Sequence, residues 1–179
     1  DYYASRGLGD VYKRQIQISL SNINLRAAYH VTSPDNGQFV FTTDQGKTYK
    51  IGFIQDYMIS DDGVYQFFIN TEDEFKTAPD KRVRQTVMVV LEEFFRQKEV
   101  VLDYICDTGD NRQAARSRIF NSWFRLFANQ NLFTLRPMSV KAEGIEFFAA
   151  VVLRNDNPRF SNIIDAIQQF EKQIKDKLQ

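Results

Sequence analysis

Hydrophobic and polar residues alternate through the first half of the chain. Between residues 29 and 70, apolar side chains recur at every second position in short runs. This period of two is typical of β-strands with one buried face. Turns that combine Asp or Asn with a glycine separate the runs, as is usual between antiparallel strands. The pattern predicts a β-meander with strands at residues 29–31, 39–41, 49–53 and 65–69.

The hydrophobic period changes to 3.6 at Pro79. Val83, Val87 and Phe94 lie on one helical stripe, which predicts an amphipathic helix with Pro79 and Asp80 in its first turn. The later patterns predict, in order, an inner strand over 100–106, a helix over 110–129, a hairpin of strands 132–135 and 145–153 with Gly144 near its turn, and a last helix from about Pro158.

These elements predict one α+β domain, with an antiparallel-rich sheet of six or seven strands covered by three packed helices. Their order is β-meander, α, β, α, β-hairpin, α. Ile16, Ile18 and Leu20 alternate and would supply a further strand. The second and third helices are amphipathic, so we expect them to pack on the sheet.

Residues 1–15 are predicted to be foreign to this domain. Residues 5–15 resemble the translation of a transposase-based sequencing adapter, and residues 1–4 lie upstream of it. Such a segment indicates a metagenomic gene, and it is set aside as an expression tag would be. The predicted domain therefore covers residues 16–179.

Charge and composition limit the kinds of partner. The chain has 23 basic and 23 acidic residues, and leaving out the three basic and two acidic ones of residues 1–15 gives 20 against 21. Near neutrality argues against nucleic acid as the main partner, because coating phosphates requires a dense basic surface. No apolar run approaches the ~20 residues of a membrane span, so no membrane partner is expected. A single cysteine and the lack of a secretory pattern predict a cytoplasmic protein.

The junction at residues 104–113 is the candidate site, because polar groups gather there where an apolar strand gives way to a helix. Helix N-termini expose unpaired N–H groups that favour anions, and ligands often bind beyond the carboxyl ends of strands. The candidate ligand-binding residues are Asp107, Thr108, Asp110, Arg112 and Arg116.

Helical projection places Arg112 and Arg116 on the predicted buried face with Ile119 and Trp123. Buried arginines need carboxylates or a bound anion. In one interpretation, Thr108 or Asp110 caps the helix, Gly109 relieves a tight turn, and Asp/Arg pairs brace helix against strand. In the other, the two arginines grip a phosphate or carboxylate, and Asp107 acts as a base or metal ligand.

The sequence contains no complete catalytic set. One histidine and one cysteine, His30 and Cys106, limit nucleophilic and histidine-based metal chemistry, and there is no Gly-rich phosphate loop or Cys-pair zinc pattern. We therefore predict no cofactor and no metal, and the question of enzymatic activity stays open. Two neighbours in the pairs Trp123-Phe124 and Phe147-Phe148 cannot both point fully inward. One of each pair is either core covered by another element, or exposed aromatic surface for a protein partner.

The motif Tyr-Ile-Cys-Asp-Thr-Gly-Asp-Asn-Arg-Gln at residues 104–113, followed by Arg116, Phe120 and Trp123, resembles the hallmark of an uncharacterised bacterial family, a domain of unknown function. The resemblance covers roughly residue 29 to the C-terminus. It implies one bacterial α+β domain and carries no activity with it. The sequence favours a non-catalytic binding or regulatory protein that acts through a protein partner. The alternative is a small phosphate-ligand binder, or an enzyme of phosphoryl-transfer or phosphoesterase type, at residues 103–116.

Overall fold

The computed structural model describes residues 16–35, 37–71, 73, 77–106, 108–127, 131–142 and 144–177. The predicted foreign segment 1–15 and the candidate Asp107 lie outside these residues. The sheet has six strands in the order β1-β2-β3-β4-β6-β5. The strands are β1 Gln38–Thr42, β2 Thr48–Asp56, β3 Val64–Asn70, β4 Val101–Ile105, β5 Phe133–Ala142 and β6 Ile145–Arg154, and the helices are α1 Leu20–Asn24, α2 Lys81–Phe94, α3 Gln113–Phe127 and α4 Phe160–Lys177.

All neighbouring strands are antiparallel except β3 and β4, which run parallel and are connected through α2. The predicted α+β class and the antiparallel-rich sheet are confirmed. Gly46 and Gly144 take φ values of +78° and +80° at the β1–β2 and β5–β6 turns. Glycine is favoured at such positions because it has no Cβ to clash with the backbone.

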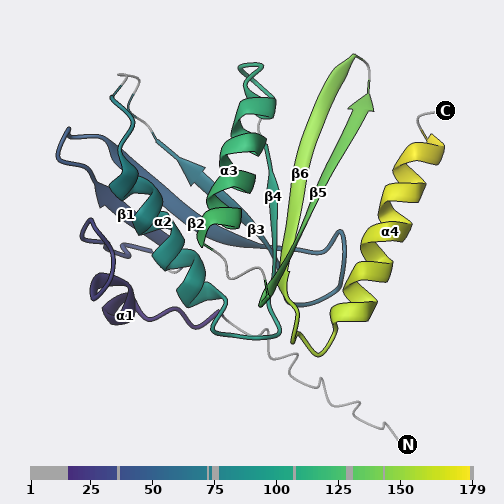
Figure 1. Cartoon of the computed structure of the whole chain (residues 1–179), viewed down its shortest axis with the longest axis horizontal. Coiled ribbons are helices and arrows are strands. Elements are labelled where there is room, and N and C mark those ends of the chain that lie inside the picture. Colours follow the sequence, from purple (N-terminus) through teal and green to yellow (C-terminus); the bar gives the residue numbers. More distant parts are fainter. Residues whose placement is uncertain are drawn as a thin grey trace, which may run out of the picture.

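The helices cover both faces of the sheet. Successive β4 residues point to opposite faces: Leu102 and Tyr104 join the core beneath α2 and α3, whereas Val101 packs with Ile163 and Ile167 of α4. Figure 1 shows α2 and α3 side by side over the sheet, with α4 apart from them. The second and third predicted helices correspond to α3 and α4, and the prediction that they pack on the sheet agrees with this arrangement.

Two predictions for the N-terminal region are wrong. The described residues contain four helices rather than three, because Leu20 starts α1 instead of ending a strand. The Ser19 side chain caps this helix by accepting a hydrogen bond from the Asn22 N–H at 3.3 Å. Residues 29–31 also form no strand, since the N–H and carbonyl of Val31 bond to the Asn24 side chain at 2.8 Å. A side-chain amide here replaces the neighbouring strand as the backbone partner.

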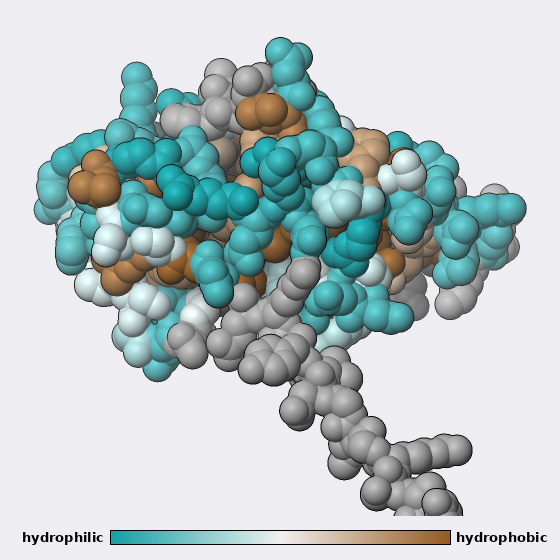
Figure 2. Space-filling view, turned by 90° about the horizontal axis from the view of Figure 1, so that it is seen from below, coloured by the Kyte–Doolittle hydropathy of each residue, from teal (hydrophilic) through white to brown (hydrophobic). Residues whose placement is uncertain are grey.

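The surface seen from below is mostly hydrophilic, with hydrophobic residues in small separate patches (Figure 2). This mixture is ordinary for a globular domain. Within the described residues, no helix is both long and apolar enough to cross a bilayer.

Thr86 ties α2 to the segment before β1. Thr86 is fully buried. Its hydroxyl accepts a hydrogen bond from the Tyr29 N–H at 3.1 Å and donates one to the Arg82 carbonyl at 2.9 Å. We expect Thr86→Val to lower the free energy of unfolding by ~1–3 kcal/mol, because it preserves shape and leaves a buried N–H unpaired. Urea unfolding measures this loss, with the exposed Thr42→Val as control. Equal losses in the two variants would contradict the role given to Thr86.

Candidate functional site

A cavity of about 750 Å³ opens between the N-terminal end of α2 and one side of α3. We call it the basic cleft. Its aromatic wall is formed by Tyr49 and Trp123. The basic side chains that line it are Lys47, Lys81, Arg84 and Arg112, and they come from the β1–β2 turn, the first turn of α2 and the start of α3.

A second cavity of about 180 Å³, the aromatic pocket, adjoins the basic cleft. Tyr49, Ile119 and Trp123 line both cavities, and the second one is completed by Phe67, Ile69, Asn70, Thr71, Tyr104, Arg116 and Phe120. It lies where β3 and β4 part: their pairing ends at Phe67 and Tyr104, whereas β3 continues to Asn70. The ring of Phe120 stacks on that of Tyr104, with centroids 4.2 Å apart, and packs against this opening.

The start of α2 has an unusual charge pattern. Lys81, Arg82 and Arg84 occupy its first turn, and no acidic residue lies there. The N-terminal end of a helix carries partial positive charge, so cations there destabilise it and an anion nearby stabilises it. The N-cap Asp80, whose side chain accepts from the Arg82 N–H, compensates part of this charge. A bound anion would stabilise this end of α2 further.

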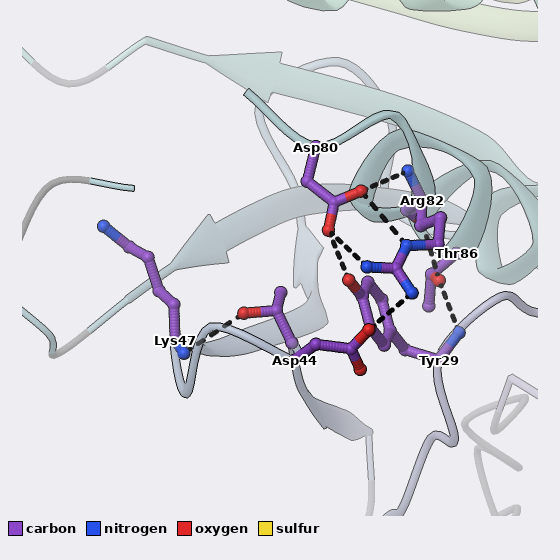
Figure 3. Close-up of polar contacts among 7 residues, drawn as sticks. Tyr29, Asp44, Lys47, Asp80, Arg82 and Thr86 are labelled. Carbon is purple, nitrogen blue, oxygen red and sulfur yellow. Dashed lines mark hydrogen bonds and ion pairs between the residues drawn. The ribbon is translucent and has the colours of Figure 1, made fainter. Parts of the chain in front are cut away.

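Arg82 does not line the basic cleft, and its side chain belongs to the network drawn in Figure 3. Its guanidinium pairs with Asp44 at 2.6 Å and with Asp80, and lies 4.7 Å from the ring centre of Tyr29. The Tyr29 hydroxyl donates to Asp80, and this bond holds the pKa of that carboxyl below its usual range. In the same view, the Lys47 side chain extends away from Asp44 and Arg82. Asp80, the one acidic residue among the described residues that line the basic cleft, is thus already engaged.

Two of the candidate residues from the sequence form an ion pair. Arg116 bonds to both carboxylate oxygens of Asp110, at 2.6 and 2.7 Å, and this contact lowers the pKa of Asp110. The side chains are 34% and 45% exposed, so the pair lies at the surface and not on the buried face that the helical projection predicted for Arg116. The α3 helix begins at Gln113, and the turn before it places the pair at its edge. Exposed pairs contribute little to stability, so we expect Arg116→Ala to melt near the wild type.

Arg112 lies on the surface and lines the basic cleft. No ion pair joins its guanidinium to another residue in the described part of the chain. The backbone N–H of Arg112 donates to the Asp110 side chain at 3.1 Å. Thr108 is half-buried, and its carbonyl accepts from the Asn111 N–H at 3.2 Å. The residue with positive φ in this turn is Asn111, at +58°, rather than the predicted Gly109. The candidate residues therefore divide between an ion pair and the cleft wall.

The buried face of α3 also differs from the prediction. Ser117, Phe120 and Phe124 are buried, whereas Ile119 is 50% exposed and Trp123 is only partly buried. The predicted apolar stripe is real, but part of it lines the two cavities instead of the core. An apolar residue that faces a cavity has the same helical period as one that faces the core, so the pattern alone does not separate them.

The structure gives Cys106 the environment of a core residue. The thiol is 2% exposed, and burial raises its pKa. Burial likewise raises the pKa of the neighbouring Tyr104 hydroxyl. An activated nucleophile requires the opposite shift. Among the described residues, no three His, Cys, Asp or Glu side chains converge as a metal site would require.

Comparison with known proteins identifies the family. The model of a family of unknown function, DUF6169, matches residues 79–171, more than half of the chain, and the chain belongs to that family. The match includes α2, α3 and the junction between β4 and α3. It thus covers three of the four basic residues of the cleft.

The remaining comparisons add no functional information. No curated protein matches the chain. One similar solved structure is described as a CoA-dependent acyl-homoserine lactone synthase, MesI, with 9% identity, a TM-score of 0.36, and coverage of 78% of this chain and 71% of that one. A similarity at this level supports no statement about activity.

Proposed function

We propose that this protein binds a small phosphate-bearing organic anion in the basic cleft. The observation that carries the proposal is the convergence of four basic side chains on one cavity: Lys47, Lys81, Arg84 and Arg112. Lysine and arginine bind phosphate through charge-assisted hydrogen bonds, which are about twice as strong as neutral ones. The helix dipole of α2 adds to this attraction.

The two cavities together favour a ligand with a planar or apolar part. Tyr49 and Trp123 line both of them, and their rings provide a stacking surface at the boundary. A nucleotide satisfies both requirements, since its phosphates suit the basic cleft and its base suits an aromatic wall. In this arrangement Arg112 binds a phosphate group. Arg116, which pairs with Asp110, lines the aromatic pocket. A phosphoryl-transfer reaction would additionally need a base, for which Asp107 is the candidate.

A thermal-shift screen tests the proposal with inorganic phosphate, pyrophosphate, ADP and coenzyme A as probes. A ligand that binds only the native state at about 100 times its Kd adds ~2.7 kcal/mol of stability, which corresponds to roughly 5–10 °C for a domain of this size. We expect Arg112→Ala to lose most of this shift.

The matched control is Arg125→Ala, because Arg125 is an exposed arginine on the same helix and lies outside both cavities. The control should keep the full shift. A shift of the same size in both variants, or none with any probe, would contradict binding in the basic cleft.

We propose a protein partner as the second function, on the evidence of a separate apolar groove. This cavity of about 380 Å³ lies between the β5–β6 hairpin and the C-terminal half of α4. Met58, Ile105 and Phe147 line it and are 58%, 41% and 40% exposed. Exposed apolar side chains around a concavity are typical of protein-binding surfaces. Affinity capture from a bacterial lysate compares the proteins that bind to the wild type with those that bind to Phe147→Glu. Identical sets of bound proteins would contradict binding at this groove.

A further inference from the structure

Lys47 reaches the basic cleft from a short turn, whereas Lys81 and Arg84 belong to α2. The turn joins β1 to β2, and its position relative to α2 decides whether Lys47 lies on the cleft wall. Surface turns are generally more mobile than the helices and strands that they connect. A contact between this turn and α2 is therefore needed if Lys47 is to bind the same ligand as the helix residues.

The turn is closed by hydrogen bonds of its own. The Thr43 N–H donates to the Lys47 carbonyl at 2.9 Å, and the Lys47 N–H donates to the Thr43 hydroxyl at 3.1 Å. The Gly46 N–H donates to the Thr43 carbonyl at 2.9 Å, and Thr43 itself is buried. Asp44 lies between Thr43 and Lys47 in the sequence. A contact that fixes Asp44 thus also limits the movement of Lys47.

Arg82 supplies this contact from the first turn of α2. Its Nη1 donates to Asp44 Oδ2 at 2.6 Å, and its Nε lies 3.4 Å from Asp80 Oδ1 (Figure 3). Asp80 is the N-cap of the same helix, and its side chain is mostly buried. In the same view, the Lys47 side chain points away from Asp44. Arg82 therefore joins the turn to α2 and leaves the Lys47 side chain to face the cleft.

A stack of aromatic rings gives Arg82 a rigid base. Its guanidinium lies 4.7 Å from the ring centre of Tyr29, which is buried. The Tyr29 ring stacks on Phe41 with centroids 5.9 Å apart, and Phe41 stacks on Tyr49 with centroids 5.3 Å apart. Phe41 belongs to the core, and Tyr49 lines the basic cleft. A guanidinium held against a fixed ring loses less conformational entropy when it pairs with Asp44.

We propose that Arg82 is a positioning residue for the basic cleft: through its pair with Asp44 it fixes the β1–β2 turn and so places Lys47 on the cleft wall. The inference rests on the proposed function, since it concerns the same binding site. Without the pair the turn moves more freely, and Lys47 contacts a bound phosphate for less of the time. The Arg82 and Asp44 side chains are 48% and 69% exposed, and exposed pairs contribute little to stability. Loss of the pair should therefore reduce affinity while the fold is retained.

Asp44→Ala separates positioning from a general charge effect, because the two predict changes of opposite sign. The substitution removes a negative charge near a cationic cavity, which by charge alone would strengthen the binding of an anion. Positioning predicts instead that pyrophosphate binds ~10-fold more weakly, close to the lower limit for the loss of one charge-assisted hydrogen bond. Isothermal titration with pyrophosphate measures the affinity, and a thermal melt of each variant shows whether the fold is retained.

The matched control is Asp35→Ala. Asp35 is exposed, precedes β1 at the end opposite to Asp44, and does not line the basic cleft. The control removes the same charge from the same part of the chain. It should bind pyrophosphate as tightly as the wild type or slightly more tightly.

A double-mutant cycle tests whether Arg82 acts through Lys47. We expect Arg82→Ala to weaken pyrophosphate binding in the wild type and to change it little in a Lys47→Ala background, because coupled residues are not additive. In an Arg112→Ala background, Arg82→Ala should weaken binding by its full factor, since Arg112 lies before α3 and outside the turn. A direct charge effect of Arg82 on the ligand would persist in both backgrounds.

The possible results distinguish this inference from the proposed function. The inference alone is overturned if the wild type binds pyrophosphate and Asp44→Ala binds it equally or more tightly. It is also overturned if Arg82→Ala has the same effect with and without Lys47, or if Asp44→Ala loses its fold together with its affinity. If the wild type binds neither pyrophosphate nor ADP, the proposed function is wrong and the inference is wrong with it.

Discussion

Phe94→Ala is expected to lower the free energy of unfolding by ~3–5 kcal/mol, the range observed when a large buried aromatic side chain is truncated. Phe94 ends α2 and is 0% exposed. Its ring stacks on Phe53 at 4.4 Å and meets Tyr65 and Phe95 edge to face. The ring therefore joins α2 to β2 and β3, and its loss leaves a cavity that rigid strands fill only in part.

Guanidinium or urea unfolding measures this loss. Phe147→Ala is the matched control, since Phe147 belongs to the same sheet but is 40% exposed. The control should lose far less, because little apolar surface is removed from the interior. Comparable losses in the two variants would mean that Phe94 is not the link between helix and sheet described above.

The double reversal Lys81→Glu with Arg112→Glu is expected to weaken binding of a phosphate ligand by more than ~100-fold. Each lost charge-assisted hydrogen bond costs ~1.5–3 kcal/mol, and the new carboxylates repel the ligand. The variant should still fold, because both native side chains are exposed and Glu at the start of α2 suits the helix dipole better than Lys. Isothermal titration with ADP compares the affinities.

The control for this prediction reverses Arg125 and Lys172, which are exposed and lie outside the two cavities. It changes the net charge of the protein by the same amount. Binding should survive in the control, because most of the attraction comes from groups in the basic cleft. If both double variants lose affinity equally, the attraction is a general charge effect and the cleft is not the site.

The sequence predicted most of the sheet because its apolar residues alternate clearly. Phe39, Ile51 and Phe67 are buried at the positions that a period of two requires. The errors arose where side chains replace strand pairing. Asn24 satisfies the backbone of Val31, and Ser19 caps a helix near Leu20. Such contacts depend on residues brought together by folding, so no local period reveals them.

The site was only partly predictable. Arg112 was found because it lies at a strand-to-helix junction, but Lys47 and Arg84 belong to elements far away in the sequence. The run Lys81-Arg82-Val83-Arg84 directly after the N-cap Asp80 was a usable signal, since basic residues are disfavoured at that end of a helix. Pairing of Arg116 with a neighbouring carboxylate was one of two alternatives that the sequence left open, and the structure places its pair with Asp110 at the surface.

Fluorescence of Trp123 during titration with ADP is the measurement that tests the basic cleft most directly. Trp123 is the one tryptophan of the chain and lines both cavities, so its emission reports the site itself. We expect a saturable change that weakens as salt is added and that disappears in the Lys81→Glu, Arg112→Glu variant. No saturable change at low salt, or one that persists in that variant, would contradict it.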